Sequence, residues 1–338
     1  MPSQNSYKRS SPNKELDNTV KDYQKQFLEI KAELGKIIVG QEDIIDAMIL
    51  SLMCNGHVLV EGVPGIAKTL TVKTLANVTN SQFSRIQFTP DLLPTDIIGI
   101  TTYEEGRGFY SVKGPVFANF VLADEINRAP PKVQSALLEA MQEHQVTIGK
   151  ESFSLPNPFF VMATQNPIES LGTYKLPEAQ IDRFLFKLQM KYPSAEEELR
   201  IIHQNSTLKK FEDFNLKTVF TTDQILMAQQ DVKKIYMDKK VEKYIVEIVE
   251  ATRHPEKYNL TTGKYIEYGT SPRSTIALYI VSKAYALLNG KSFVTPMHVK
   301  AVAHNILRHR ILLNYEGQAD EISTDKIIDE ILRRVPVP

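Results

Sequence analysis

The chain has 338 residues, of which 42% are hydrophobic and 24% charged, a balance typical of a globular protein long enough for two domains. Its 40 basic and 40 acidic residues cancel, which excludes a global field that would attract nucleic acid or an anionic membrane. The single cysteine, Cys54, excludes an intrachain disulfide framework.

The sequence also suggests where the protein works. No stretch approaches the roughly 18 apolar residues of a membrane span, and the first residues lack the apolar region of a secretory signal. We therefore expect a cytoplasmic protein without membrane insertion. Residues 1–20 are rich in Ser, Asn, Lys and Pro, which predicts a flexible N-terminal tail.

The rest of the chain changes its pattern once. Residues 21–192 alternate short β-branched or aromatic runs with helical periodicity, which predicts βαβ units and a largely parallel sheet. After residue 192 the alternation stops, and residues 193–338 are predicted to form a helical domain. The five expected strands are residues 58–61, 83–88, 120–123, 159–163 and 184–190.

Two segments exceed a minimal doubly wound sheet, and both predict β-hairpins. In the first, residues 101–103 and 108–112 flank a polar turn that contains Gly106. In the second, residues 145–148 and 152–155 flank a turn at Gly149. Hairpins that project from an α/β core are candidate elements for contact with a partner.

The predicted helical domain carries capping signals and two histidines. Ser271-Pro272 and Thr295-Pro296 are typical of helix starts, with an N-cap residue followed by a first-turn proline. His304 and His309 are expected on one helix. An offset of five does not place them on the same face, so packing or solvent contact is favoured over a metal site.

The most informative motif lies between the first predicted strand and a helical pattern. Residues 62–69, Gly-Val-Pro-Gly-Ile-Ala-Lys-Thr, match a phosphate-binding loop, in which backbone N–H groups and a helix N-terminus face phosphate oxygens. Lys68 would hold the β- and γ-phosphates, and Thr69 a magnesium ion. Ala67 replaces the usual glycine, and its Cβ requires a negative φ. The alternative is an ordinary strand-to-helix turn.

Two carboxylates follow the third predicted strand, at the edge where α/β sheets bind ligands. Asp124 would hold Mg²⁺ through water or beside Thr69, and Glu125 would deprotonate the attacking water. The alternative is a solvated pair at a loop start. The chain contains no Asn-Lys-x-Asp motif for reading guanine, so ATP is favoured over GTP.

The fourth predicted strand leads into Thr164-Gln165-Asn166-Pro167. A neutral amide at this edge of the sheet could position water and sense the γ-phosphate without adding negative charge. The alternative for Asn166 is the opening of a common Asn-Pro turn.

These motifs together resemble the MoxR-type AAA+ ATPases, of the helix-2-insert group that includes magnesium-chelatase ATPase subunits and MCM helicases. The matching segments span almost the whole chain in the family's order: residues 62–69, 122–129, 163–167, 177–184 and 271–273. The resemblance implies a P-loop AAA+ core with a five-stranded parallel sheet and two hairpin insertions, followed by an all-α lid domain. It also suits Ala67, which MoxR-like loops often carry.

The resemblance assigns further roles. Asn166 matches sensor 1, Arg183 the arginine finger that acts on the ATP of a neighbouring subunit, and Arg273 sensor 2. Alternatively, Arg183 pairs with Asp182 or Glu178 on the surface. Arg128 is a candidate for contact with a neighbouring subunit or a partner. By the resemblance, Val39, Gly40 and Gln41 occupy the segment that contacts adenine. The expected nucleotide-binding residues are Val39, Gly40, Gln41, Gly62, Val63, Pro64, Gly65, Ile66, Ala67, Lys68, Thr69, Leu70 and Asp124.

The expected function is therefore Mg²⁺-dependent ATP hydrolysis in a homo-oligomeric ring, a hexamer, coupled to chaperone-like remodelling of a client protein. By resemblance, the client would carry a von Willebrand factor A domain. One alternative is a DNA-dependent motor, which the zero net charge and the few basic residues of the hairpins oppose. The other is a nucleotide-switched binding module, which need not keep a hydrolytic arrangement.

Overall fold

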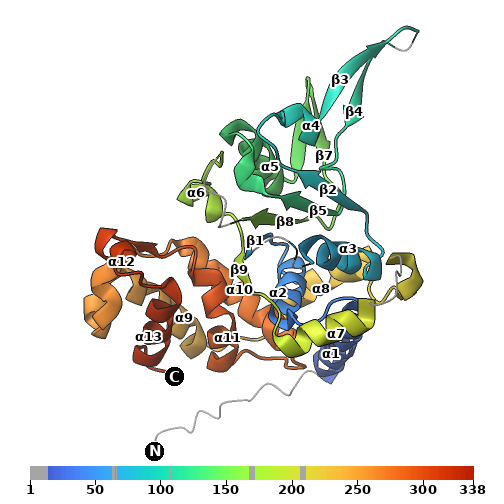
Figure 1. Ribbon diagram of the computed structural model, residues 1–338. Helices are drawn as coiled ribbons and strands as arrows, with labels where there is room; N and C mark the ends of the chain where they lie inside the picture. Colours follow the sequence, from blue (N-terminus) through green and yellow to red (C-terminus); the bar gives the residue numbers. More distant parts are fainter. Residues whose placement is uncertain (1–13, 63–64, 66, 107, 167–171, 206–210) are drawn as a thin grey trace, which may run out of the picture.

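The computed structural model describes residues 14–62, 65, 67–106, 108–166, 172–205 and 211–338. Figure 1 shows a sheet with helices on its two faces, a hairpin that projects from it, and a helical C-terminal region. None of the helices in this described part combines the length and apolar character needed to cross a membrane.

The central sheet has five parallel strands, as expected, and their order is β2-β5-β8-β1-β9. Strand β8 lies between β5 and β1. The three strand ends that carry the predicted motifs therefore lie side by side. The strands are β1 (Val58–Gly62), β2 (Phe83–Gln87), β5 (Phe120–Asp124), β8 (Phe160–Gln165) and β9 (Phe186–Met190).

Each inner strand is buried on both faces, because its side chains alternate between two apolar layers. In β5, Phe120 and Leu122 belong to one core, whereas Val121 and Ala123 belong to the other. The first layer is covered by α1 (Lys14–Gly35), α2 (Glu42–Met53) and α3 (Lys68–Val78). The second is covered by α4 (Pro94–Ile98), the 3₁₀ helix η1 (Ile126–Arg128) and α5 (Pro131–Glu143), with α6 (Glu178–Ile181) nearby.

Helix α1 corrects the expected length of the tail. It begins at Lys14, so residues 14–20 are helical and Val20 is fully buried. The polar composition of residues 14–20 does not indicate a helix. Its few apolar residues form one because they pack against the rest of the chain. Tyr23 on the same helix donates a hydrogen bond to Asp231 at 2.8 Å, which ties α1 to the C-terminal region.

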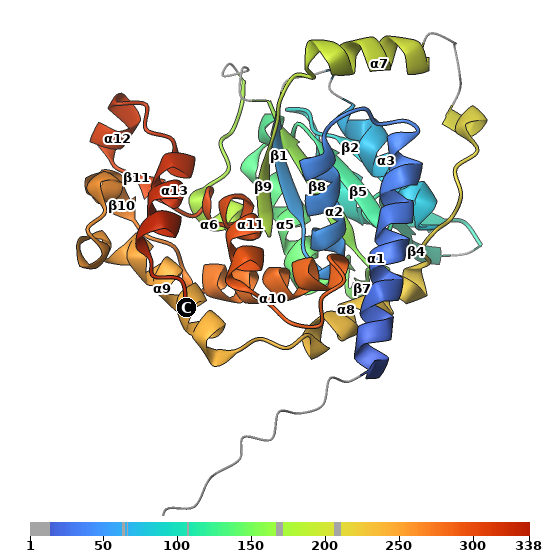
Figure 2. The same cartoon turned by 90° about the horizontal axis from the view of Figure 1, so that it is seen from below.

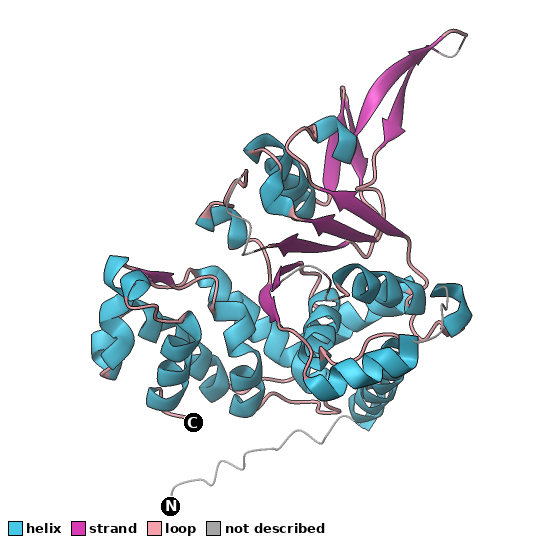
Figure 3. Ribbon diagram, viewed as in Figure 1, coloured by secondary structure: helices cyan, strands magenta, loops and turns pink. Residues whose placement is uncertain are grey.

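Both predicted hairpins are confirmed as antiparallel pairs. The first joins β3 (Gly99–Glu104) to β4 (Gly108–Lys113), and the second joins β6 (Gln145–Ile148) to β7 (Glu151–Ser154). The β3–β4 hairpin extends away from the body of the molecule (Figure 3). Near its end, the rings of Tyr103 and Phe109 lie 5.2 Å apart and are both exposed.

The C-terminal lid region is helical, with a short antiparallel pair added to it. The pair joins β10 (Ile266–Tyr268) to β11 (Leu312–Leu313), strands too short to produce a detectable alternation. The helices are α7 (Ala195–Asn205), α8 (Thr222–Lys234), α9 (Lys239–Arg253), α10 (Pro272–Leu288), α11 (Pro296–Leu307), α12 (Tyr315–Ala319) and α13 (Thr324–Arg334). The described residues of this region also form the 3₁₀ helices η2 (Phe211–Phe214), η3 (Pro255–Tyr258) and η4 (Thr261–Tyr265).

The lid packs against the same apolar layer as α1 and α2, and Figure 2 shows α8 and α10 beneath these helices. The predicted helix starts are confirmed, with Ser271 and Thr295 as N-cap residues and a proline at each first turn. The expectation for His309 is wrong, because α11 ends at Leu307. His304 instead pairs with Asp329 at 2.9 Å, whereas His309 is buried near the sheet. The division at residue 192 stays a prediction.

One buried carboxylate holds the lid together and gives a pH-dependent stability. Glu330 on α13 accepts hydrogen bonds from the backbone N–H groups of Thr261 and Thr262 at 2.7 and 2.9 Å, and from both hydroxyls. These bonds outweigh the desolvation by burial, which opposes them, and lower the pKa of Glu330 to about 2. The carboxylate therefore stabilises the folded lid wherever it is ionised.

Because the pKa is lower in the folded state, this stability is complete above the unfolded value of about 4.3 and disappears as the pH falls to about 2. Glu330→Gln should therefore lower the free energy of unfolding at pH 7 by about 2–3 kcal/mol. The difference from wild type should become small near pH 2, where Glu330 is half protonated in the folded state and protonated in the unfolded state. Urea titrations from pH 7 to 2, with exposed Glu316→Gln as the control, test this; a pH-independent difference would contradict it.

Candidate functional site

The phosphate-binding loop connects β1 to α3 as predicted. Strand β1 ends at Gly62 and α3 begins at Lys68, while Val63, Pro64 and Ile66 lie outside the described residues. Gly65 has φ +84°, a conformation that glycine adopts without cost. The N-terminus of α3 begins directly after this segment, and the helix dipole favours an anion there.

Ala67 departs from the expectation. We expected a negative φ, but Ala67 has φ 63° and ψ 21°, in the left-handed region. An L-residue in that region costs about 1–2 kcal/mol. The turn into α3 imposes this conformation, so the loop keeps the glycine-like backbone shape despite carrying a Cβ.

Lys68 lines a cavity of about 450 Å³. Its ammonium group donates a hydrogen bond to the Gly62 carbonyl, and burial lowers its pKa while Asp124 and Glu125 oppose that shift. A cationic side chain at this place, whose charged form burial disfavours, would be stabilised by a polyphosphate. The cavity is lined by Gly65, Ala67, Lys68, Thr69, Leu70, Arg85, Gln87, Asp124, Glu125 and Asn166.

Asp124, at the carboxyl end of β5, is held on both oxygens. Its Oδ1 accepts a hydrogen bond from the Thr164 hydroxyl at 2.7 Å, and its Oδ2 pairs with Arg85 Nη2 at 2.6 Å. Thr164 comes from the neighbouring strand β8 and Arg85 from β2. The parallel register of the three strands thus fixes the carboxylate at the mouth of the cavity.

Glu125 follows directly and has an unusual backbone. Its φ of 57° and ψ of 48° are left-handed, and its N–H donates to the Thr164 hydroxyl at 2.8 Å. The carboxylate accepts hydrogen bonds from Gln87 at 2.8 Å and from Arg128 at 3.3 Å. Strained backbone of this kind concentrates at functional sites, because it aims a side chain that a relaxed backbone would turn elsewhere.

Asn166 follows β8 and reaches the same cavity, with 7% of its surface exposed. The structure thus brings Lys68, Thr69, Asp124, Glu125 and Asn166 together, as the sequence indicated. It adds Arg85 and Gln87, which we did not predict, and it shows that Thr164 of the Thr164–Pro167 motif hydrogen-bonds Asp124. Arg85 and Gln87 lie two residues apart on one face of β2, and this polar pair at the end of a short strand is the signal that could have found them.

The oxygen donors at the cavity fit a magnesium ion. Mg²⁺ prefers hard oxygen ligands from one or two protein groups and keeps several waters. The Thr69 hydroxyl and the Asp124 carboxylate both line the cavity. Since Arg85 and Thr164 already occupy the Asp124 oxygens, contact through water or release of Arg85 is the compatible mode.

The predicted adenine-binding segment lies at the start of α2. Gln41 has a left-handed φ of 60° and donates from its side chain to the Lys191 carbonyl at 3.0 Å, so the segment is tied to the chain after β9. A Cβ on Gly40 would meet the Glu197 carboxylate of α7. Val39, Gly40 and Gln41 do not line the cavity that holds Lys68, and their contact with adenine stays a prediction.

Arg183 and Arg273 lie apart from this cavity. They line a second one of about 330 Å³, together with Asp182 and Arg310. Arg183 donates to the Leu138 carbonyl at 3.2 Å, whereas Asp182 pairs with Arg273 at 3.2 Å and with Arg310 at 2.7 Å. The predicted catalytic residues of one subunit therefore form two groups at different places.

Comparisons with known proteins agree with this architecture. Residues 57–186 match the ATPase family associated with various cellular activities (AAA), and residues 260–331 match the AAA lid domain. The chain is 47% identical to Chaperone MoxR1 of Mycobacterium tuberculosis over 90% of this chain and 81% of that protein. The chain belongs to the MoxR-type AAA+ ATPases. A MoxR-type ATPase core is thus followed by its lid, as the resemblance implied.

Two further similarities extend over the MoxR-type chain. It is 43% identical to the uncharacterized protein YeaC of Bacillus subtilis over 90% of this chain and 92% of that one. A crystal structure of a protein from Cytophaga hutchinsonii, assigned as an ATPase, superposes with a TM-score of 0.90 at 46% identity and covers 96% of this chain and 98% of that one. Membership of this family supports nucleotide binding, ATPase activity and a chaperone-like role.

Proposed function

We propose that this MoxR-type protein hydrolyses ATP at sites shared between neighbouring subunits of a ring, and that the cycle remodels a partner protein. The observation that carries the proposal is the division of polar machinery within one subunit. Lys68, Thr69, Asp124, Glu125 and Asn166 share one cavity, whereas Arg183 and Arg273 line another. Two incomplete halves are what a composite intersubunit site requires.

The first half would bind and hydrolyse the nucleotide. The loop amides and Lys68 hold the phosphates, Asn166 orients a water molecule, and Glu125 accepts its proton. A magnesium ion held near Thr69 and Asp124 would neutralise developing phosphate charge. Because Gln87 and Arg128 engage the Glu125 carboxylate here, at least one of these bonds must be released before Glu125 acts as a base.

The second half would act on the ATP of the next subunit. Arg183 is exposed and is not paired with Asp182, which bonds Arg273 and Arg310 instead. That leaves its guanidinium accessible for a phosphate, where a cationic finger is worth about 10³ to 10⁵ in rate. Arg273, next to it, would contribute a second positive charge. Arg128 contacts Glu125 of its own subunit, which favours a local role for it.

The client and ring size belong to this proposal as well. A hexamer, a cytoplasmic location and a client with a von Willebrand factor A domain follow from the family resemblance. The projecting β3–β4 hairpin, with Tyr103 and Phe109 exposed, is a suitable client contact because exposed aromatic residues favour protein interfaces. The zero net charge disfavours a DNA motor, and hydrolysis stimulated by DNA would reverse that preference.

Mixing two inactive variants tests the composite site. Glu125→Gln removes the base but keeps Arg183, whereas Arg183→Ala keeps the base but removes the finger. Mixed rings should contain interfaces with both groups intact, so ATP hydrolysis should return to a fraction of the wild-type rate set by the mixing ratio. The measurement is phosphate release against mixing ratio, in rings shown by fluorescence to exchange subunits. A rate of ATP hydrolysis that stays at the level of the separate variants would contradict the proposal.

A further inference from the structure

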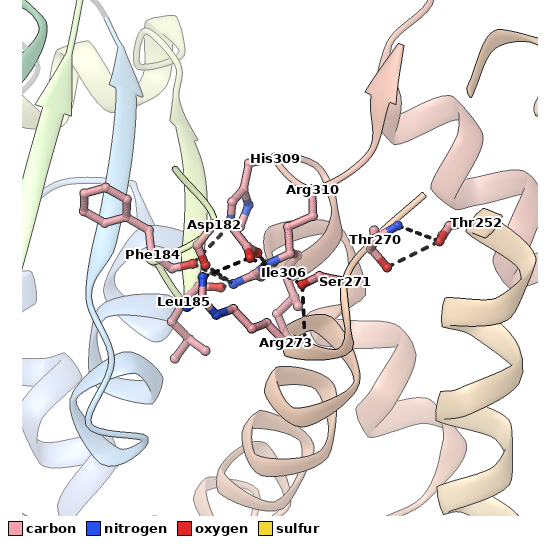
Figure 4. Close-up of polar contacts among 10 residues, drawn as sticks. All are labelled: Asp182, Phe184, Leu185, Thr252, Thr270, Ser271, Arg273, Ile306, His309 and Arg310. Carbon is pink, nitrogen blue, oxygen red and sulfur yellow. Dashed lines mark hydrogen bonds and ion pairs between the residues drawn. The ribbon is translucent and has the colours of Figure 1, made fainter. Parts of the chain in front are cut away.

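One buried arginine of the lid, Arg310, hydrogen-bonds the segment that carries Arg183. Arg310 is 8% exposed and donates from Nε to the Asp182 carboxylate at 2.7 Å. Its Nη2 donates to the carbonyls of Asp182 at 3.2 Å and Phe184 at 2.8 Å, and its Nη1 to Leu185 at 3.3 Å (Figure 4). The planar guanidinium is thus fixed to backbone on both sides of Arg183.

The two residues before Arg310 extend this contact. His309 is hydrogen-bonded through Nε2 to the Phe184 carbonyl at 3.1 Å, and Arg308 donates to the Lys187 carbonyl at 2.8 Å. Since burial is the main cause that lowers the pKa of His309, with Arg310 adding to it, the imidazole is neutral and donates from Nε2. Three consecutive lid residues therefore bind residues 182–187.

Asp182 links this contact to Arg273, the second arginine that the proposed function assigns to the neighbouring subunit's ATP. Its Oδ1 accepts from Arg310, while its Oδ2 accepts from Arg273 at 3.2 Å and from the Ser271 hydroxyl at 3.3 Å. Figure 4 shows the carboxylate between the two guanidinium groups. One carboxylate thus balances part of two positive charges and fixes the start of α10 to the segment that carries Arg183.

We propose that Arg310 is a positioning residue that holds Arg183 and Arg273 in one fixed arrangement for the ATP of the neighbouring subunit. The inference rests on the proposed composite site. Arg310 does not line the cavity that holds Lys68, so it would act on the neighbour's site through the backbone around Arg183. Its fork of N–H donors suits this task, because a lysine cannot reach several carbonyls at once.

The geometry also explains why a buried charge is kept at this position. A neutral apolar residue would fill the space, and replacement of a buried ion pair by such residues is often neutral for stability. It would, however, leave the carbonyls beside Arg183 without donors. A displacement of about 1 Å in catalytic machinery can cost about 10²-fold in rate, so rigidity here has a direct consequence for hydrolysis.

The test places Arg310→Lys in one or the other member of the mixed rings. The first mixture combines the double variant Glu125→Gln/Arg310→Lys, which donates the finger, with Arg183→Ala. Its rescued rate of hydrolysis should be about 10²-fold lower than that of the original mixture. The second mixture combines the double variant Arg183→Ala/Arg310→Lys, which supplies the base, with Glu125→Gln. Its rescued rate of hydrolysis should equal that of the original mixture. The Kd for a fluorescent ATP analogue should be that of wild type in both. Equal losses in the two arrangements would show a general structural role and overturn the inference.

Glu330→Gln is the matched control, because it disrupts a buried lid network that does not touch residues 182–187, and it should leave both rescues intact. If Arg310→Lys does not fold, Asp182→Asn decides: it keeps the shape but removes the charge, and should produce the same asymmetry with a smaller loss. Symmetric behaviour of Asp182→Asn would refute the proposal. If Glu125→Gln and Arg183→Ala, mixed without any change at Arg310, do not restore hydrolysis, the proposed composite site itself is contradicted.

Discussion

Replacing Arg183 with alanine is expected to slow ATP hydrolysis by about 10³- to 10⁵-fold, the range that an arginine finger contributes. The affinity for ATP should change little, because Arg183 does not line the cavity that contains Lys68 and Thr69. Steady-state phosphate release gives the rate, and titration with a fluorescent ATP analogue gives the affinity. A lower rate of hydrolysis with an unchanged affinity is expected of a residue that acts from a neighbouring subunit. A residue of the binding loop would change the affinity as well.

Two companion variants sharpen this expectation. Arg183→Lys keeps the charge but lacks the planar fork, so its rate should lie between alanine and wild type. Arg333→Ala, an exposed lid arginine that contacts the Asp329 carbonyl of its own helix, should have wild-type activity. Turnover by Arg183→Ala within a few-fold of wild type would remove Arg183 from catalysis and leave it as a surface residue bonded to Leu138.

Replacing Glu125 with glutamine is expected to slow hydrolysis by about 10²- to 10⁴-fold, the usual contribution of a general base. The amide keeps the size of the side chain and can still accept from Gln87, so the site should retain its shape. ATP should then bind and persist, which single-turnover assays with labelled ATP would show as slow conversion of bound nucleotide. A client captured in this state would also become identifiable.

Lys68→Ala provides the contrast for Glu125→Gln. Loss of the ammonium group should abolish nucleotide binding itself, because no other lysine lines this cavity in the described residues. Equal binding losses in both variants would mean that Glu125 supports the fold of the site. Normal turnover by Glu125→Gln would exclude it as the base.

The sequence was sufficient for the sheet and for most of the nucleotide cavity. Strands β5 and β8 are continuous apolar runs because both of their faces are buried, and such runs are easily recognised. Asp124 and Asn166 follow strands that are neighbours in the sheet, so their proximity was predictable from the carboxyl-end rule. The left-handed Ala67 was not predictable, because the turn geometry overrides the preference of the residue.

The contacts between distant segments were beyond sequence reasoning. Arg273 is separated from Asp182 by 91 positions, and nothing in the local pattern indicates that the two side chains meet. A buried Arg310 is equally invisible, since arginine usually marks an exposed position in a periodic pattern. Its role emerges only when the lid and the sheet are seen together.

The parallel pairing of β1 and β9 has a consequence for assembly. Gly62, where the nucleotide loop begins, pairs with Met190 at the end of β9, whereas Arg183 precedes Phe186, which pairs with Val58 at the opposite end. The nucleotide loop and the segment that carries Arg183 therefore leave opposite ends of the same pair of strands, which are roughly 13 Å apart for the four steps between five residues. A head-to-tail contact would place the arginine half of each subunit against the nucleotide half of the next, and a rotation that closes makes such contacts a ring. The proposed composite site is therefore compatible with the proposed ring.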